Sequence, residues 1–123
     1  MTLSAGHVVV TCPLGTHFEG NPRATASAGS EVVIHRFPMG IPQPVLSDGF
    51  RGRAVLSHYL TPTGSKIYTS GCLPLPEPVV AHFEASRITG FSGAADAVAS
   101  VEAHYERVAH EFNLDAYNID SWH

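Results

Sequence analysis

From the N-terminus to Ser92, short apolar runs alternate with clusters of proline and glycine, which is typical of a chain of short strands. Residues 7–12 form a β-branched run that stops at Pro13, and residues 31–37 form a second run of this kind. The same pattern predicts further strands at 66–69, 78–85 and 87–91, and residues 53–60 could form either a strand or a short helix. We expect 53–60 and 66–69 to form a hairpin, and Ala85-Ser86 to connect the last two strands tightly.

The hydrophobic period changes after Ser92. Apolar residues then recur three or four positions apart, at Ala94, Val98, Val101, Tyr105, Val108 and Phe112. This spacing forms one apolar face of a helix. Ser92 is a favourable N-cap, and Asn113 can end the helix in a left-handed conformation. We therefore expect an α+β fold, with a mostly antiparallel twisted sheet or partial β-barrel and one long C-terminal helix over residues 93–112.

Size and composition favour a single domain over residues 1–123. Apolar residues make up 44% and charged residues 15%, and the low charge suggests a surface partly covered by another chain or domain. The net charge of −4 and the scattered Lys and Arg argue against a nucleic-acid partner, and no apolar stretch is long enough to span a membrane. The N-terminus lacks the positive region of a secretory signal, and Cys12 and Cys72 are too few for a disulfide framework. We therefore expect a cytoplasmic protein.

Two His-x-Glu steps offer the first candidate chemistry, His17-Phe18-Glu19 and His82-Phe83-Glu84. Residues i and i+2 of a strand point to the same face, so each step places an imidazole beside a carboxylate. On neighbouring strands, His17, Glu19, His82 and Glu84 could hold a divalent metal. The alternative is a water-facing strand surface with the two phenylalanines in the core.

Two other groups of polar residues carry weaker signals. Glu102, Glu106 and His110 are four residues apart on one helix face, which favours either metal ligation or the solvated face opposite the apolar stripe. Residues 120–123, Asp-Ser-Trp-His, contain the residue types of a nucleophilic triad. Triads are assembled from distant positions, and no Gly-x-Ser-x-Gly elbow occurs, so we do not expect a serine hydrolase.

Three segments, in order, resemble the C-terminal half of the aminopeptidase T-type metallopeptidases. Residues 12–18 look like that family's strand and Pro-x-Gly-Thr element, residues 37–44 like its Pro-x-Gly-Glu segment, and residues 77–97 like its hairpin and following helix. The resemblance spans residues 8–123 and extends to the dihydroxypyridine ring-cleaving dioxygenases, which share the fold and use a mononuclear iron. It implies an iron or zinc cofactor in the full-length protein.

The resemblance also implies an incomplete ligand set. The glutamate of the Pro-x-Gly-Glu segment is a metal ligand in the family, but the matching position here is Ile41, which cannot bind a metal. A second ligand glutamate matches Ser121, where a serine is similar to the dioxygenases, and His123 is nearby. The family's N-terminal α/β domain has no counterpart, so we expect a fragment of a larger two-domain protein.

Two functional hypotheses follow. The first is a domain of a metal-dependent enzyme, a ring-cleaving dioxygenase or an aminopeptidase, that is incomplete as a catalyst by itself; Ser121 favours it. The second is a non-catalytic relative that binds a peptide or a small aromatic molecule; Ile41 favours it. An exposed sheet edge and low charge also predict association, either as a homo-oligomer or with a missing domain.

Overall fold

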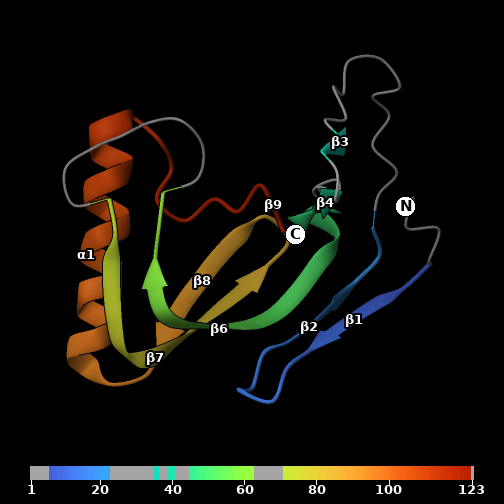
Figure 1. The fold of residues 1–123 in the computed structure, drawn as a ribbon, viewed down its shortest axis with the longest axis horizontal. Helices are drawn as coiled ribbons and strands as arrows, with labels where there is room; N and C mark the ends of the chain where they lie inside the picture. Colours follow the sequence, from blue (N-terminus) through green and yellow to red (C-terminus); the bar gives the residue numbers. More distant parts are fainter. Residues whose placement is uncertain (1–5, 23–34, 37–38, 41–44, 63–70, 123) are drawn as a thin grey trace.

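The computed structural model describes residues 6–22, 35–36, 39–40, 45–62 and 71–122 (Figure 1). Its main element is an antiparallel sheet in the order β1-β2-β6-β7-β8, built from Val8–Thr11, His17–Gly20, Phe50–Leu60, Leu73–Glu84 and Arg87–Ser92. Helix α1 (Ala95–Phe112) follows the last of these strands. The predicted α+β fold is confirmed, and the sheet is open rather than closed into a barrel.

Two short strand pairs accompany the main sheet. Strand β3 (His35–Arg36) pairs with β4 (Met39–Gly40), and β5 (Val45–Leu46) pairs with β9 (Ser121–Trp122). A 3₁₀ turn, η1 (Ser47–Gly49), joins β5 to β6. Most of the strand predicted at 31–37, and all of the one predicted at 66–69, lies outside the described residues.

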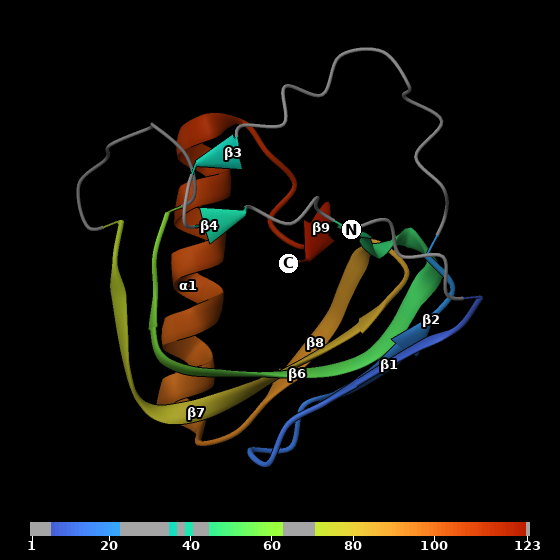
Figure 2. The same cartoon turned by 45° about the vertical axis from the view of Figure 1, so that its right-hand side comes forward.

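The sheet curves strongly, and α1 and β9 lie on its concave side (Figure 2). Two apolar clusters fill this side. The first contains Phe18, Phe50 and Phe83, with Trp122 of β9 packed against them. The second joins α1 to β7 and consists of buried Leu75, Val79 and Val101, with partly buried side chains around them that include Phe91 and Tyr105. The burial of Phe18 and Phe83 means that the flanking His and Glu side chains point to the convex outer face.

Helix α1 begins two residues later than predicted. Its N-cap is Ala94, which makes no side-chain capping bond, whereas Ser92 ends β8 and its hydroxyl lies 2.8 Å from Nε2 of His82. The predicted C-terminus is confirmed: Asn113 adopts the left-handed conformation, with φ of 53°, and its N–H donates to the carbonyl of Ala109. None of the helices within the described residues combines the length and apolar character needed to cross a bilayer.

Strand β7 is longer than the predicted 78–85, because it begins at Leu73. Prolines normally disrupt strands, since they cannot donate to the ladder. Here β6 advances from Leu56 to His58 while β7 runs from Val79 back to Leu75, so the register shifts between them. Pro76 and Pro78 fall in that irregular stretch, where an unpaired backbone is tolerated. The predicted tight connection after β7 is confirmed by the β7–β8 register, in which Glu84 pairs with Arg87.

Candidate functional site

The two His-x-Glu steps lie on the same outer face of the sheet, with β6 between them. His17 is paired with Arg53, which is paired with His82, so these three form one cross-strand row. The next row consists of Glu19, Arg51 and Glu84. The four predicted site residues therefore share one shallow hollow of about 380 Å³, which also contains Arg51, Gly52, Phe83 and Thr89.

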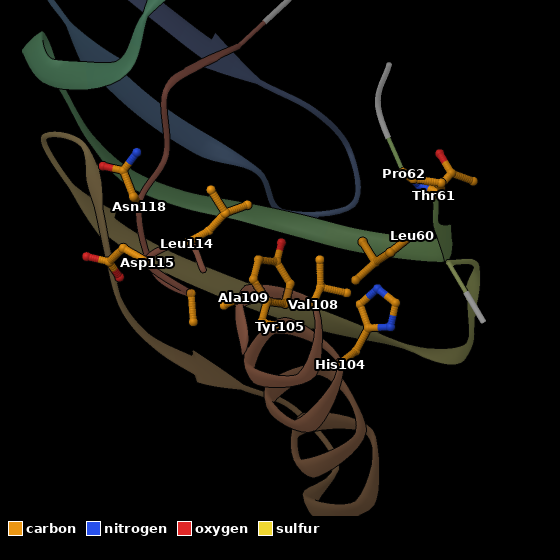
Figure 3. Close-up of a pocket in the computed structure, with 11 residues that line it drawn as sticks. Leu60, Thr61, Pro62, His104, Tyr105, Val108, Ala109, Leu114, Asp115 and Asn118 are labelled. Carbon is orange, nitrogen blue, oxygen red and sulfur yellow. The ribbon is translucent and has the colours of Figure 1, made fainter. Parts of the chain in front are cut away.

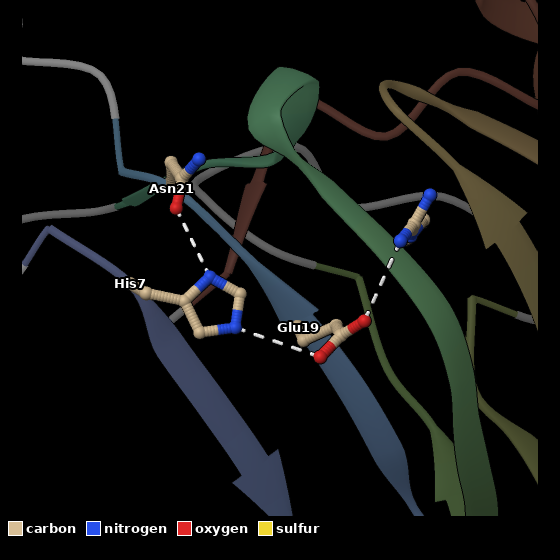
Figure 4. Close-up of polar contacts among 4 residues, drawn as sticks. His7, Glu19 and Asn21 are labelled. Carbon is tan, nitrogen blue, oxygen red and sulfur yellow. Dashed lines mark hydrogen bonds and ion pairs between the residues drawn. The ribbon is translucent and has the colours of Figure 1, made fainter.

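Polar contacts tie the groups around Glu19 together. Its carboxylate lies 3.5 Å from Nε2 of His7 and 3.6 Å from the guanidinium of Arg51 (Figure 4). The other ring nitrogen of His7 lies 3.0 Å from Oδ1 of Asn21. All of these side chains are at least one-third exposed, so the ion pairs are screened by solvent and add little to stability.

The predicted metal ligands on this face do not converge. Adjacent strands are about 4.8 Å apart, so β6 separates the backbones at His17 and His82 by about 9–10 Å, and the two steps do not lie on neighbouring strands. The cations Arg51 and Arg53 also lie between the two steps and oppose the binding of a further cation. Across the described ranges, no three His, Cys, Asp or Glu side chains are grouped to hold a metal. The iron or zinc prediction thus stays a prediction, and these residues do not fit it as one site.

Ser121 lies in β9, half-buried and opposite Leu46 of β5. Its neighbour Trp122 packs edge-on against Phe18 and Phe50, with ring centroids 5.3 Å apart in both cases. The predicted ligand His123 lies outside the described residues. Ser121 is therefore a single oxygen ligand candidate anchored beside the aromatic core.

Ser47 holds this C-terminal segment in place, a role that sequence analysis missed. It is buried, its hydroxyl donates to the carbonyl of Ile119, and its backbone N–H donates to the carbonyl of Asp120 at 3.1 Å. A serine in a turn after a Pro-rich stretch gives no sequence signal for a partner more than 70 residues away.

The helix stripe Glu102, Glu106 and His110 shows no metal arrangement among the described residues. Glu106 instead accepts a hydrogen bond of 3.3 Å from the hydroxyl of Tyr117, which follows the helix. Partial desolvation of the hydroxyl, followed by the nearby carboxylates of Glu106 and Glu102, raises the pKa of Tyr117. Glu106 thus helps to fix the chain after α1.

A groove with a volume of about 290 Å³ lies between the C-terminal half of α1 and the end of β6. We call it the α1 groove; its lining residues are Leu60, Thr61, Pro62, His104, Tyr105, Val108, Ala109, Leu114, Asp115, Ala116 and Asn118. Figure 3 shows the ring of Tyr105 reaching from the helix toward β6, between Leu114 and Val108. Leu114 is 63% exposed, so a large apolar side chain stands open at the rim.

Tyr105 adds a hydroxyl to a groove that mixes apolar side chains with polar ones. The ring packs against Phe91, with centroids 5.7 Å apart, and burial raises the pKa of the phenol. Its hydroxyl therefore stays protonated at neutral pH. Within the described part of the chain it has no hydrogen-bond partner, although it projects into the groove. The helical period assigned Tyr105 to the core, and the ring does belong there, but the pattern could not reveal the position of its hydroxyl.

The titratable groups beside Tyr105 favour a neutral groove. Burial, followed by the nearby charge of Arg107, lowers the pKa of His104, so its imidazole is uncharged at neutral pH. The carboxylate of Asp115 already accepts hydrogen bonds from the N–H of Tyr117 and, at 2.7 Å, from Arg87. A ligand in the groove would thus meet aromatic and apolar surfaces and the neutral polar groups of Tyr105, Thr61 and Asn118, rather than a free charge at these positions.

No protein-family model, curated protein or solved structure matches this chain.

Proposed function

We propose that this chain is a ligand-binding domain, not a catalyst by itself, and that the α1 groove binds a small aromatic molecule. The observation that carries the proposal is the hydroxyl of Tyr105, which lines a partly apolar groove and has no hydrogen-bond partner among the described residues. Ligand sites in proteins commonly combine apolar walls with a few polar groups that orient the ligand. A ring with an acceptor atom would bury the apolar walls and accept a hydrogen bond from Tyr105.

The size of the groove favours a single ring over a peptide. A cavity of about 150 Å³ can hold benzene. The α1 groove, at about 290 Å³, thus has room for one ring with polar substituents, but little for an extended peptide. A hydroxylated pyridine, the type of substrate that the dioxygenase resemblance implies, has the right size and carries acceptor atoms. His104 is uncharged and can stack on such a ring.

The proposal can be tested by NMR titration of the purified chain with 2,5-dihydroxypyridine and, separately, with trialanine. We expect the ring compound to shift the methyl signals of Leu60, Val108 and Leu114, and trialanine to leave them unchanged. Tyr105→Phe should weaken binding about fivefold, because one neutral hydrogen bond contributes about 1 kcal/mol. Tyr59→Phe is the matched control, since Tyr59 is 61% exposed and outside the groove. Unshifted groove methyls, or equal affinity of Tyr105→Phe and wild type, would contradict the proposal.

A second candidate function is a contribution to the metal centre of a larger enzyme, similar to the ring-cleaving dioxygenases or aminopeptidases. It is supported by the β5–β9 pairing, which sets Ser121 opposite Leu46, just after the Pro-rich segment that the resemblance matches to a ligand-bearing one. One serine cannot hold iron or zinc, so the other ligands would have to come from outside the described residues. Metal analysis of the purified protein and of Ser121→Ala tests this: bound iron or zinc that is lost in the variant supports it, and metal-free wild type speaks against it.

We also infer a cytoplasmic setting. The free, exposed thiols of Cys12 and Cys72 support it, because exposed thiols persist in reducing compartments. Intact mass spectrometry of protein isolated from its native cells, without added reductant, would find both thiols reduced. A disulfide-linked species would contradict the inference.

A further inference from the structure

The two edge strands of the main sheet, β8 and β1, differ in the backbone pairing on their outer sides. At the β8 edge, the N–H of Ile88 donates to the carbonyl of Tyr117, and the N–H of Ile119 donates to the carbonyl of Ser86, both at 2.8 Å. A bridge between Arg87 and Asn118 lies between these bonds. Strand β1 forms the other edge, and no residue of the described ranges pairs with its outer side. The start of the β8 edge is thus covered by the chain's own backbone, whereas the β1 edge is left open by the described residues (Figure 1).

The alternation of hydrogen-bonded pairs between β1 and β2 shows which backbone groups of β1 point away from β2. The N–H of Cys12 donates to the carbonyl of Thr16, which makes these two a hydrogen-bonded pair. In an antiparallel ladder, such pairs alternate with pairs whose N–H and C=O groups point away from the partner strand. Val10 and Val8 are therefore bonded to β2, and Val9 and Thr11 direct their N–H and C=O groups outward. Residue 7 continues the same alternation.

The composition of β1 leaves this edge unprotected. Its sequence is Val-Val-Val-Thr, without charge, proline or glycine, and Val9 is 51% exposed. Proteins usually protect an open edge with lysine, proline, a bulge or a covering segment, because free N–H and C=O groups recruit another strand. An uncharged β-branched edge favours such recruitment, and two copies of it do not repel each other at the point of contact.

We propose that β1 pairs antiparallel with β1 of a second copy of this chain, about a two-fold axis at Val9. Val9 then lies opposite Val9 of the second copy, and His7 lies opposite Thr11, so that outward-facing groups meet on both strands. An axis at Val10 would instead set His7 opposite Pro13, which has no N–H to donate. The two sheets become one continuous sheet, in which Val8 of one copy neighbours Val10 of the other and extends the apolar layer over Phe18.

The pairing is expected to be weak and concentration-dependent. One short strand edge buries less than the roughly 1,200 Å² of a standard stable interface. Each copy also carries a net charge of −4, so added salt should strengthen the association by screening the repulsion. We expect a Kd in the range of about 10 µM to 1 mM.

Analytical ultracentrifugation of wild type, Val9→Pro and Val9→Lys over that concentration range tests the proposal. Proline at position 9 removes an N–H that makes no bond to β2, so it should block pairing and leave the β1–β2 ladder intact. We expect association at least tenfold weaker in both variants, with circular dichroism unchanged. If Val9→Pro fails to fold, Val9→Lys decides the outcome. A wild type that stays monomeric throughout, or a folded variant that associates as well as wild type, overturns the proposal.

Disulfide trapping tests the register. In a background of Cys12→Ser and Cys72→Ser, oxidation of Val9→Cys should yield a covalent dimer, because a hydrogen-bonded antiparallel pair has Cα atoms about 5.5 Å apart, within disulfide range. Thr11→Cys is the control: its two copies are offset by four residues, about 13 Å along the strands, and should not cross-link. Equal cross-linking of the two variants, or cross-linking of Thr11→Cys alone, overturns the register at Val9.

Discussion

The rings of Phe18 and Phe83 meet with centroids 5.5 Å apart, although their strands are not neighbours. The residue between them on β6 is Gly52, which is paired with both phenylalanines. The two outer strands are about 9–10 Å apart, so only a missing side chain at the middle position lets the rings close over β6. This glycine joins the first and second halves of the sheet into one aromatic core.

Replacing Gly52 with alanine should therefore destabilise the fold by about 2–4 kcal/mol. A Cβ there would lie 2.6 Å from the Cα and 2.8 Å from the Cβ of Phe18, and the φ of +142° is strained for any other residue. Urea denaturation measures the loss of stability. Gly90→Ala is the matched control, since a Cβ at this other strand glycine meets nothing within 4 Å. A Gly52→Ala variant as stable as Gly90→Ala would contradict the role of Gly52.

Ser47→Ala should loosen the chain after α1. The variant leaves the carbonyl of Ile119 without its hydroxyl donor, which we expect to cost about 1–3 kcal/mol. Hydrogen exchange at residues 117–122 should accelerate more than in the rest of the sheet. Ser100→Ala removes a hydroxyl that bonds to the Asp96 carbonyl on the exposed helix surface, and should change stability by less than about 0.5 kcal/mol. Similar exchange rates in the two variants would argue against the Ser47 anchor.

Asp115→Asn should reduce stability at neutral pH but not in acid. Hydrogen bonds from the Tyr117 N–H and from Arg87 hold the pKa of Asp115 below its usual value. A depressed carboxyl pKa stabilises the folded state above the unfolded pKa of about 4, and the effect disappears as the pH falls through the lower folded value. Melting temperatures of wild type and variant should thus differ at pH 7 and converge below about pH 3. A difference that persists unchanged in acid would show that the charge of Asp115 is not responsible.

Cys12 should react with thiol reagents at a lower pH than an ordinary cysteine. Hydrogen bonds from Thr16, through its side chain and its backbone, lower the pKa of the exposed Cys12 thiol. The thiolate is the reactive form. As the pH is raised, the rate of alkylation by iodoacetamide should therefore begin to increase at a lower pH for Cys12 than for a free thiol. The rate is measured in the Cys72→Ser background. Thr16→Val should move this profile to higher pH; an unchanged profile would contradict the assignment.

The sequence predicts well where one local pattern decides the structure. The alternation His-Phe-Glu correctly placed Phe18 and Phe83 in the core, and Asn113 correctly ended the helix. The sequence predicts poorly where a side chain's contacts come from residues that are distant in the chain. Serine is favoured at N-caps, but Ser92 is the last residue of β8 and its hydroxyl contacts His82 instead. The open α1 groove likewise depends on how α1 lies against β6, which no local pattern contains.

The cross-strand arrangement of the outer face also could not be predicted from the sequence. The metal hypothesis required the two His-x-Glu steps to lie on neighbouring strands, but β6 lies between them and sets Arg51 beside both glutamates. Strand order is decided by the total burial of all the strands together, not by the residues of any one of them. Ser47 was missed for a related reason, since its partners are known only once β5 and β9 are paired.

The anchoring of residues 117–122 has a consequence for the order of events during synthesis. This segment covers the start of the β8 edge, bonds to Ser47, and contributes Trp122 to the aromatic cluster that includes Phe18 of β2 and Phe50 of β6. Residues synthesised early can therefore complete their contacts only after residues more than 70 positions later have been synthesised, as the contact between Ser47 and Asp120 illustrates. Such distant contacts slow folding and leave apolar surface uncovered in the meantime. While the ribosome still holds this segment, the Phe18–Phe50 surface would be a natural target for chaperones, and the nascent chain cannot complete its core until the segment has emerged.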